Sequence, residues 1–116
     1  MTGRAELEAV LLPLARMRTV ATYKQVADAL GLVPPQTVHR TAMALEALME
    51  EHAAEGRPQL AAVVVARARG GLPAPGFFAK LAALGLHDGP ETGPEAAARH
   101  AAELDRVYEH WGAPPG

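Results

Sequence analysis

The sequence predicts a single helix-dominated α+β domain, and three observations lead to this fold class. The chain has 116 residues, enough for one domain with a substantial core, and neither a repeat nor a linker divides it. Hydrophobic residues make up 49% of the chain and aromatic residues only 4%, so the core must consist mainly of Ala, Leu and Val. Alanine favours helix because it loses no side-chain entropy there, whereas one valine-rich segment is typical of a strand.

The first two helices are expected in the N-terminal quarter of the chain. Apolar residues at helical spacing predict a helix over Glu6 to Met17, which Pro13 should kink or break. Thr22 is the expected N-cap of a second, short helix, because Gln25 three residues later would complete a capping box. Gly31 is typical of the position just beyond a helix end. The residues that this helix should bury are Tyr23, Val26, Ala27 and Leu30.

A longer third helix is expected from Pro35 to about Ala54, because a proline suits the first helical position. Its core stripe should comprise Val38, Thr41, Ala42, Leu45, Leu48 and Met49. Its opposite face is polar at the N-terminal end and should comprise Gln36, His39, Arg40, Met43 and Ala47. A short helix, a glycine turn and a second helix with a polar start form the pattern of a helix-turn-helix. The second helix of that motif can lie in a DNA groove.

One strand and two more helices are expected in the second half of the chain. The best strand is Leu60 to Arg67, which contains three consecutive valines. Alternation along this strand would place four side chains on one face, namely Val63, Val65, Arg67 and Arg69. Paired glycines then predict a hairpin over Arg67 to Gly76. The remaining helices should cover about Phe77 to Leu84 and Pro94 to Trp111.

Three helices followed by a strand and an arginine-bearing hairpin are the order of elements in a winged helix-turn-helix. The predicted fold is therefore α+β and helix-dominated, a winged helix-turn-helix with an added C-terminal helix. The whole chain, residues 1–116, forms one domain in this prediction, with a core of about residues 5–85 and a C-terminal helix of about residues 94–111. The hairpin Arg67 to Gly76 would be the wing.

A further set of motifs lies between Thr19 and Gly85. A Tyr-x-x-Val-Ala helix is followed by a glycine eight residues after the tyrosine, and later by Gly-Gly-Leu and an aromatic residue. The residues in question are Tyr23, Val26, Ala27, Gly31, Ala42, Gly70, Gly71, Leu72 and Phe77. This stretch resembles the DNA-binding domain of O6-alkylguanine-DNA alkyltransferases and, more closely, the alkyltransferase-like proteins that lack the reactive cysteine. The resemblance implies a winged-helix fold that docks on DNA.

The chain departs from that family at its chemical centre. Counting back from Gly-Gly-Leu places Ala62 at the cysteine of the family's Pro-Cys-His-Arg motif, and Val63 and Val64 at its His-Arg. Without a thiolate and its histidine, alkyl transfer is not available, so the resemblance implies a non-catalytic protein. The family's groove-inserting arginine would fall near Thr37, with Arg40 one helical turn later.

Two groups of side chains are candidate DNA contacts. Those at the start of the third helix could read base edges, since Gln and Arg bind adenine and guanine bidentately; the alternative is an ordinary solvated helix start. This group is Gln36, Thr37, His39 and Arg40. A second group would contact the phosphate backbone without reading sequence, or simply be solvated surface. It comprises Lys24, Arg67, Arg69 and Lys80, which we expect to converge, together with Arg16, beside the start of the third helix.

Composition limits the other function classes. The chain has no cysteine, which excludes disulfide scaffolds and thiolate zinc sites. Its five histidines form no metal-binding pattern, so we expect no metal, no cofactor and no catalytic residue. No apolar run approaches the roughly 20 residues of a membrane span, and the N-terminal segment does not resemble a signal peptide, so we expect a cytoplasmic protein. The net charge of −2 argues against an indiscriminate nucleic-acid binder.

The last helix offers a competing interpretation. Its apolar stripe comprises Ala97, Ala101, Leu104, Val107, Tyr108 and Trp111, and should pack this helix on the body of the domain. Alternatively, Leu104, Val107, Tyr108 and Trp111 form a homodimer or partner surface. The leading function is a non-catalytic protein that binds duplex DNA, either a small transcriptional regulator or a DNA-structure sensor. The other function is a protein-interaction module, an adaptor or dimeric scaffold, that uses this helix.

Overall fold

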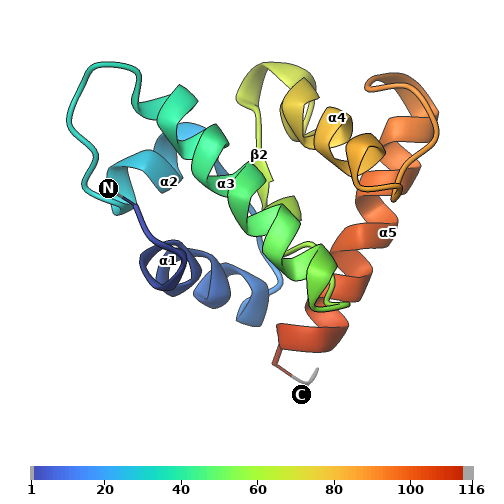
Figure 1. Ribbon diagram of the computed structural model, residues 1–116, viewed down its shortest axis with the longest axis horizontal. Helices are drawn as coiled ribbons and strands as arrows, with labels where there is room; N and C mark the ends of the chain where they lie inside the picture. Colours follow the sequence, from blue (N-terminus) through green and yellow to red (C-terminus); the bar gives the residue numbers. More distant parts are fainter. Residues whose placement is uncertain (1, 114–116) are drawn as a thin grey trace.

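The computed structural model describes residues 2–113 and places five α-helices around two very short strands (Figure 1). In chain order the α-helices are α1 (Arg4–Arg16), α2 (Tyr23–Ala29), α3 (Thr37–Ala54), α4 (Pro75–Ala83) and α5 (Gly93–Trp111). The strands are β1 (Ala21–Thr22) and β2 (Val64–Val65), and two short 3-10 helices are η1 (Leu60–Val63) and η2 (Arg67–Arg69). The prediction of a helix-dominated α+β fold is confirmed at this level.

The N-terminal helices form largely where local patterns place them. Thr22 caps α2 as predicted, because its hydroxyl accepts the Gln25 amide hydrogen while the Gln25 side chain accepts that of Thr22. Gly31 follows the helix with a φ of 71°, in the left-handed region that favours glycine. Pro13 lies inside α1, which runs on to Arg16, so the predicted break there is wrong.

The face that each long helix buries differs in part from the predicted one. In α3, Thr41, Leu45, Leu48 and Met49 are buried as predicted. Val38, on the first turn of α3, is instead 45% exposed. In α5, Ala97 and Ala101 are exposed. The helix buries Val107 as predicted, but with it Ala96, His100 and Glu103, so its inner face is rotated relative to the prediction.

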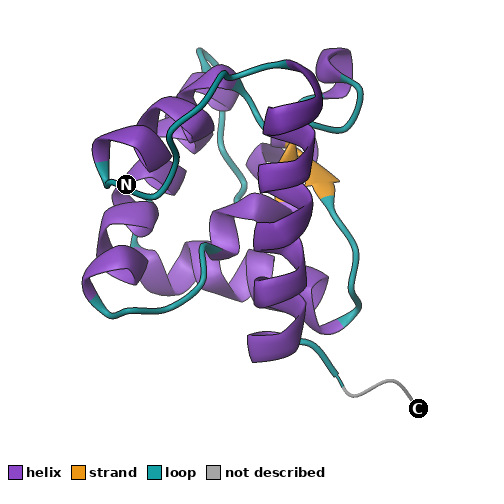
Figure 2. Ribbon diagram, turned by 90° about the vertical axis from the view of Figure 1, so that its right-hand side faces the viewer, coloured by secondary structure: helices purple, strands orange, loops and turns teal. Residues whose placement is uncertain are grey.

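The predicted strand Leu60 to Arg67 is mostly a 3-10 helix. Only Val64 and Val65 are in strand conformation, and they pair in parallel with Ala21 and Thr22. All six residues from 60 to 65 are buried, so their side chains do not alternate between core and solvent. The reason is that η1 contacts α1, α3 and α5, which cover it on several sides. Figure 2 shows helices packed around the short strands, of which β2 follows η1 directly. A segment covered all round favours continuous apolar residues over alternation.

The predicted hairpin at Arg67 to Gly76 is also wrong. This segment forms the turn η2 and then leads into α4, which begins at Pro75. Backbone hydrogen bonds close the turn upon itself, from the Ala66 amide to the Leu72 carbonyl and from the Leu72 amide to the Arg69 carbonyl. Gly70 and Gly71 supply the positive φ angles that the turn requires. A compact turn therefore occupies the place in the chain that was predicted for the wing.

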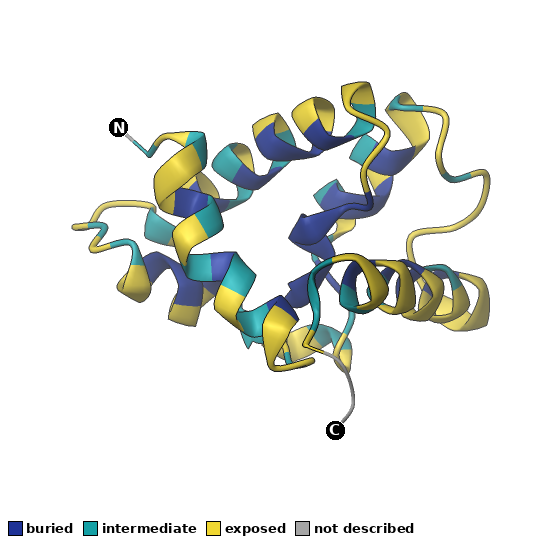
Figure 3. Ribbon diagram, turned by 90° about the horizontal axis from the view of Figure 1, so that it is seen from below, coloured by how far each residue is buried: buried dark blue, intermediate teal, exposed yellow. Residues whose placement is uncertain are grey.

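The core lies where η1 and β2 meet the inner faces of the helices. Buried segments face this centre and exposed segments face outward in Figure 3. The largest fully buried side chains include Phe78, Leu7, Leu11, Leu48 and Met49. None of the helices within residues 2–113 combines the length and the apolar character needed to cross a bilayer.

Candidate nucleic-acid interface

A groove of about 660 Å³ opens between α2, the first turns of α3 and η2. Three basic side chains line it, one from each of these elements: Lys24, His39 and Arg67. Its apolar lining includes the side chains of Val38, Ala42, Ala66, Ala68 and Ala74. Residues more than 40 positions apart in the sequence thus meet beside the start of α3. The groove therefore combines an apolar floor with positive charge.

The start of α3 is open to solvent on the same side. Gln36 precedes the helix with a φ of 56°, and no side chain caps the first turn. The amide groups of the first turn point out of the helix, and no acidic residue lies among them. Gln36, Val38, His39 and Arg40 are exposed and Thr37 is half-buried. The positive end of the helix dipole is consequently available to an anion.

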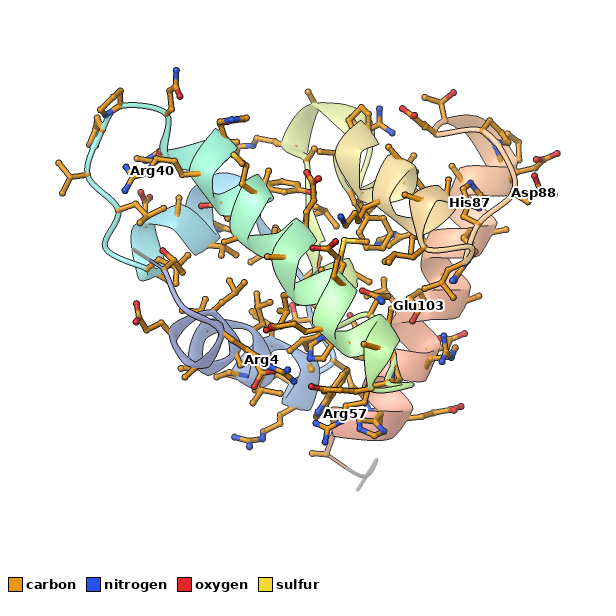
Figure 4. The ribbon with its side chains drawn as sticks, in the orientation of Figure 1. Arg4, Arg40, Arg57, His87, Asp88 and Glu103 are labelled. Carbon is orange, nitrogen blue, oxygen red and sulfur yellow. The ribbon has the colours of Figure 1, made fainter. Side chains whose placement is uncertain are left out.

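Arg40, which was predicted to read bases, is bound to its own loop. Its Nη1 atom donates to the carbonyl oxygen of Val33 at 2.8 Å and lies 3.4 Å from that of Pro35. Figure 4 shows Arg40 on the side of α3 that faces the loop from α2. The guanidinium therefore stabilises the α2–α3 connection, and it does not line the groove.

The other predicted cations converge only in part. Arg69 donates from Nε to the Pro73 carbonyl at 2.9 Å, and its Nη2 atom contacts the Glu91 carbonyl. Lys80 pairs with Glu50 at 3.1 Å. Arg16 ends α1 beside the C-terminal segment, where its carbonyl accepts the Ala113 amide. The prediction that these three cations gather at the start of α3 is wrong. Carbonyl oxygens bind Arg69, a carboxylate pairs with Lys80, and Arg16 lies at the end of α1.

The three basic side chains of the groove differ in how they are held. Lys24 pairs with Asp28 at 2.7 Å, but both side chains are more than 60% exposed, so solvent screens the pair. Arg67 and His39 make no side-chain hydrogen bond or ion pair with any part of the chain between residues 2 and 113. Of the lysine and arginine side chains of the groove, Arg67 is thus the one with no carboxylate partner within residues 2–113.

Sequence reasoning missed a buried polar layer under α5. Glu103 is 0% exposed and accepts the Gln59 amide hydrogen at 2.8 Å as well as bonds from Arg99 and Arg106. Burial raises the pKa of this carboxyl, but the Gln59 amide and Arg99 outweigh burial, so the pKa lies below its usual value. The signal in the sequence was the helical spacing of Ala96, His100, Glu103 and Val107, in which two polar residues share the inner stripe.

His52 forms a second buried contact, between α3 and α1. Its Nε2 atom lies 3.1 Å from Oε1 of Glu8, and the Trp111 ring lies 5.4 Å away between centroids. Burial lowers the pKa of His52. The predicted C-terminal stripe also faces inward: Val107 is 0% exposed, and Leu104, Tyr108 and Trp111 pack against the core. The stripe therefore packs α5 on the body of the molecule.

The position that corresponds to the alkyltransferase cysteine is fully buried. Ala62 is 0% exposed on η1, and its carbonyl oxygen accepts a hydrogen bond from Nε2 of His100 at 2.8 Å. Tyr23, the first residue of the family-like helix, accepts the Ala74 amide hydrogen on its hydroxyl at 3.0 Å. Tyr23 therefore connects α2 to the segment that leads into α4.

Comparison of the chain with protein-family models, with curated proteins and with solved structures finds no match. The likeness to alkyltransferase-like domains rests on the residues quoted above and stays a prediction.

Proposed function

We propose that this chain binds duplex DNA without catalysing a reaction, and that it responds to DNA structure more than to base sequence. The observation that carries the proposal is the groove beside the start of α3, where Lys24, His39 and Arg67 meet. Phosphates are the anions that such a set of basic side chains and an open helix N-terminus favour together. The helices α2 and α3 would act as the helix-turn-helix pair, with η2 in the role of a wing.

Two features favour structure over sequence as the property recognised. Arg40, the side chain best suited to read guanine, is engaged with Val33 and Pro35. The groove, by contrast, has a volume within the range of small-ligand pockets and an apolar lining. An unstacked nucleotide presents an apolar base face next to its phosphates, so a distorted duplex fits this groove better than a regular one.

The first test is the binding of a fluorescent duplex, measured by anisotropy at about 50 mM and about 200 mM salt. We expect affinity to fall steeply with salt, because each neutralised phosphate releases counterions. Arg67→Ala should weaken binding and reduce the salt slope by about 1. Arg57→Ala is the matched control, since this exposed arginine lies beyond the far end of α3, and it should leave binding unchanged. Absence of binding at micromolar protein and low salt would refute the proposal.

A second test separates a structure sensor from a regulator. The same duplex is prepared with and without a single-nucleotide bulge, and the two affinities are compared under one salt condition. Tighter binding to the bulged duplex is expected. Equal affinity for both, combined with a strong preference among regular sequences, would instead support the transcriptional regulator. A protein-interaction module remains the other candidate if neither duplex binds.

A further inference from the structure

The loop between α2 and α3 exposes a run of apolar residues. Val33 is 72% exposed, and Pro34 and Pro35 beside it are exposed as well. Single exposed apolar residues are common on protein surfaces, but a consecutive run at a loop tip is not. The loop stands at the edge of the molecule next to the first turn of α3 (Figure 1). We call Val33, Pro34 and Pro35 the apolar tip.

The apolar tip is held in place. Arg40, on α3, donates to the carbonyl oxygens of Val33 and Pro35, so one guanidinium binds the first and the last residue of the tip. Proline also fixes its own φ, which removes backbone freedom from two of the three residues. The Leu32 amide bonds back to the Ala27 carbonyl on α2, which fixes the approach to the tip. The tip is thus ordered from both flanking helices.

The surroundings of the tip indicate what it meets. Val38 and His39, on the first turn of α3, follow the tip after Gln36 and Thr37 and belong to the groove that Lys24 and Arg67 also line. The uncapped amides of that turn add to the positive charge. An apolar tip near a groove with basic side chains suits a polyanion with an apolar interior. A base-paired duplex has that combination, with phosphates outside and stacked bases inside. Proteins that bend DNA insert apolar side chains, proline among them, between base steps.

We propose that the apolar tip is a wedge that enters between two base steps of the bound duplex and kinks it, with Val33 leading and Arg40 as its positioning residue. This inference rests on the proposed DNA binding and adds to it a deformation of the DNA. The groove cations would hold the phosphates on one side of the kink. A flexible pyrimidine–purine step, such as TA, would be the easiest place to insert.

The test uses the full chain and a short duplex with a central TA step, labelled at its two ends for energy transfer. Anisotropy of the same duplex reports binding, and the change in transfer reports bending. We expect the protein to bind and to raise transfer, as a kink of roughly 20–90° would do. Val33→Ser should still bind but lose most of the transfer change, whereas Val33→Leu should keep it.

A control variant and two outcomes complete the test. Met17→Ser removes an equally exposed apolar side chain, 74% against 72%, at the end of α1, and should leave transfer and binding unchanged. Binding without any transfer change in the unmodified protein would overturn the wedge and leave DNA binding intact. An unaltered transfer change in Val33→Ser would also overturn it. If the unmodified protein does not bind the duplex, the wedge and the proposed function fail together.

Discussion

The Nε2 atom of His100 lies 2.8 Å from the carbonyl oxygen of Ala62 and ties α5 to η1, the segment at the centre of the core. His100 is 6% exposed and Ala62 0%, so neither group has ready access to water as an alternative partner. Because η1 also contacts α1 and α3, this bond joins α5 to the part of the molecule on which the other helices pack.

Removing the His100 side chain should therefore destabilise the protein. We expect His100→Ala to lower the free energy of unfolding by about 1–3 kcal/mol, since a buried carbonyl loses its donor. His100→Gln, which can still donate from its amide, should lose less. Urea unfolding followed by circular dichroism measures both variants, and equal losses would show that the hydrogen bond contributes little.

Glu103 should be more important still for the attachment of α5. Glu103→Ala would leave the Gln59 amide and two arginines without their carboxylate, and we expect a loss of about 1.5–3 kcal/mol, because a buried amide loses a charged acceptor. Glu109→Ala, on the exposed face of the same helix, should change stability by less than about 0.5 kcal/mol. Similar unfolding midpoints for the two variants would contradict this role.

Stability should fall as the pH drops below about 6.5. Burial lowers the pKa of both His52 and His100 from the usual value of 6.5. The unfolded chain therefore binds protons at a higher pH than the folded one, so the stabilisation is complete above pH 6.5 and is lost as the pH falls through the folded pKa values. The Nδ1 atom of His52 is buried and has no hydrogen-bond partner within residues 2–113. A proton added to this atom would therefore have no acceptor.

Urea midpoints between pH 8 and pH 5 measure this dependence. Replacing His52 or His100 by Gln should flatten the curve in that interval. His39→Gln, at an exposed position of α3, serves as the control and should leave the slope unchanged. A slope that survives both buried replacements would assign the pH dependence to other groups.

Arg40→Ala should weaken DNA binding by the same factor for every sequence. A base-reading arginine would instead show losses that depend on the base, each good contact being worth about 1–3 kcal/mol of discrimination. Because Arg40 holds the carbonyls of Val33 and Pro35, its removal loosens the loop whatever the DNA sequence. Anisotropy titrations with a panel of duplexes that differ in their G·C positions make the comparison. Losses of affinity that depend on the DNA sequence would show instead that Arg40 reads bases, as the sequence predicted.

Interactions between near neighbours in the chain were predictable. The capping box of Thr22 and Gln25 involves residues three apart, and Gly31 ends α2 by its own backbone freedom. The helical spacing of Leu45, Leu48 and Met49 placed the inner face of α3 correctly. Of the candidate site, the exposed start of α3 was also anticipated, whereas the DNA-binding role of Lys24, His39 and Arg67 stays a prediction.

The remaining features depend on segments that are distant in the chain. The valine segment favours a strand locally, yet three helices cover η1, and that burial gives a 3-10 helix with only two strand residues. Arg40 and Arg69 look equally free in the sequence, but loop carbonyls that folding brings within reach bind both. Local spacing and capping energies therefore determine where most helices form. Burial and the choice of hydrogen-bond partner determine which helix faces turn inward and which cations remain at the groove. These two depend on neighbours that only the folded chain brings together.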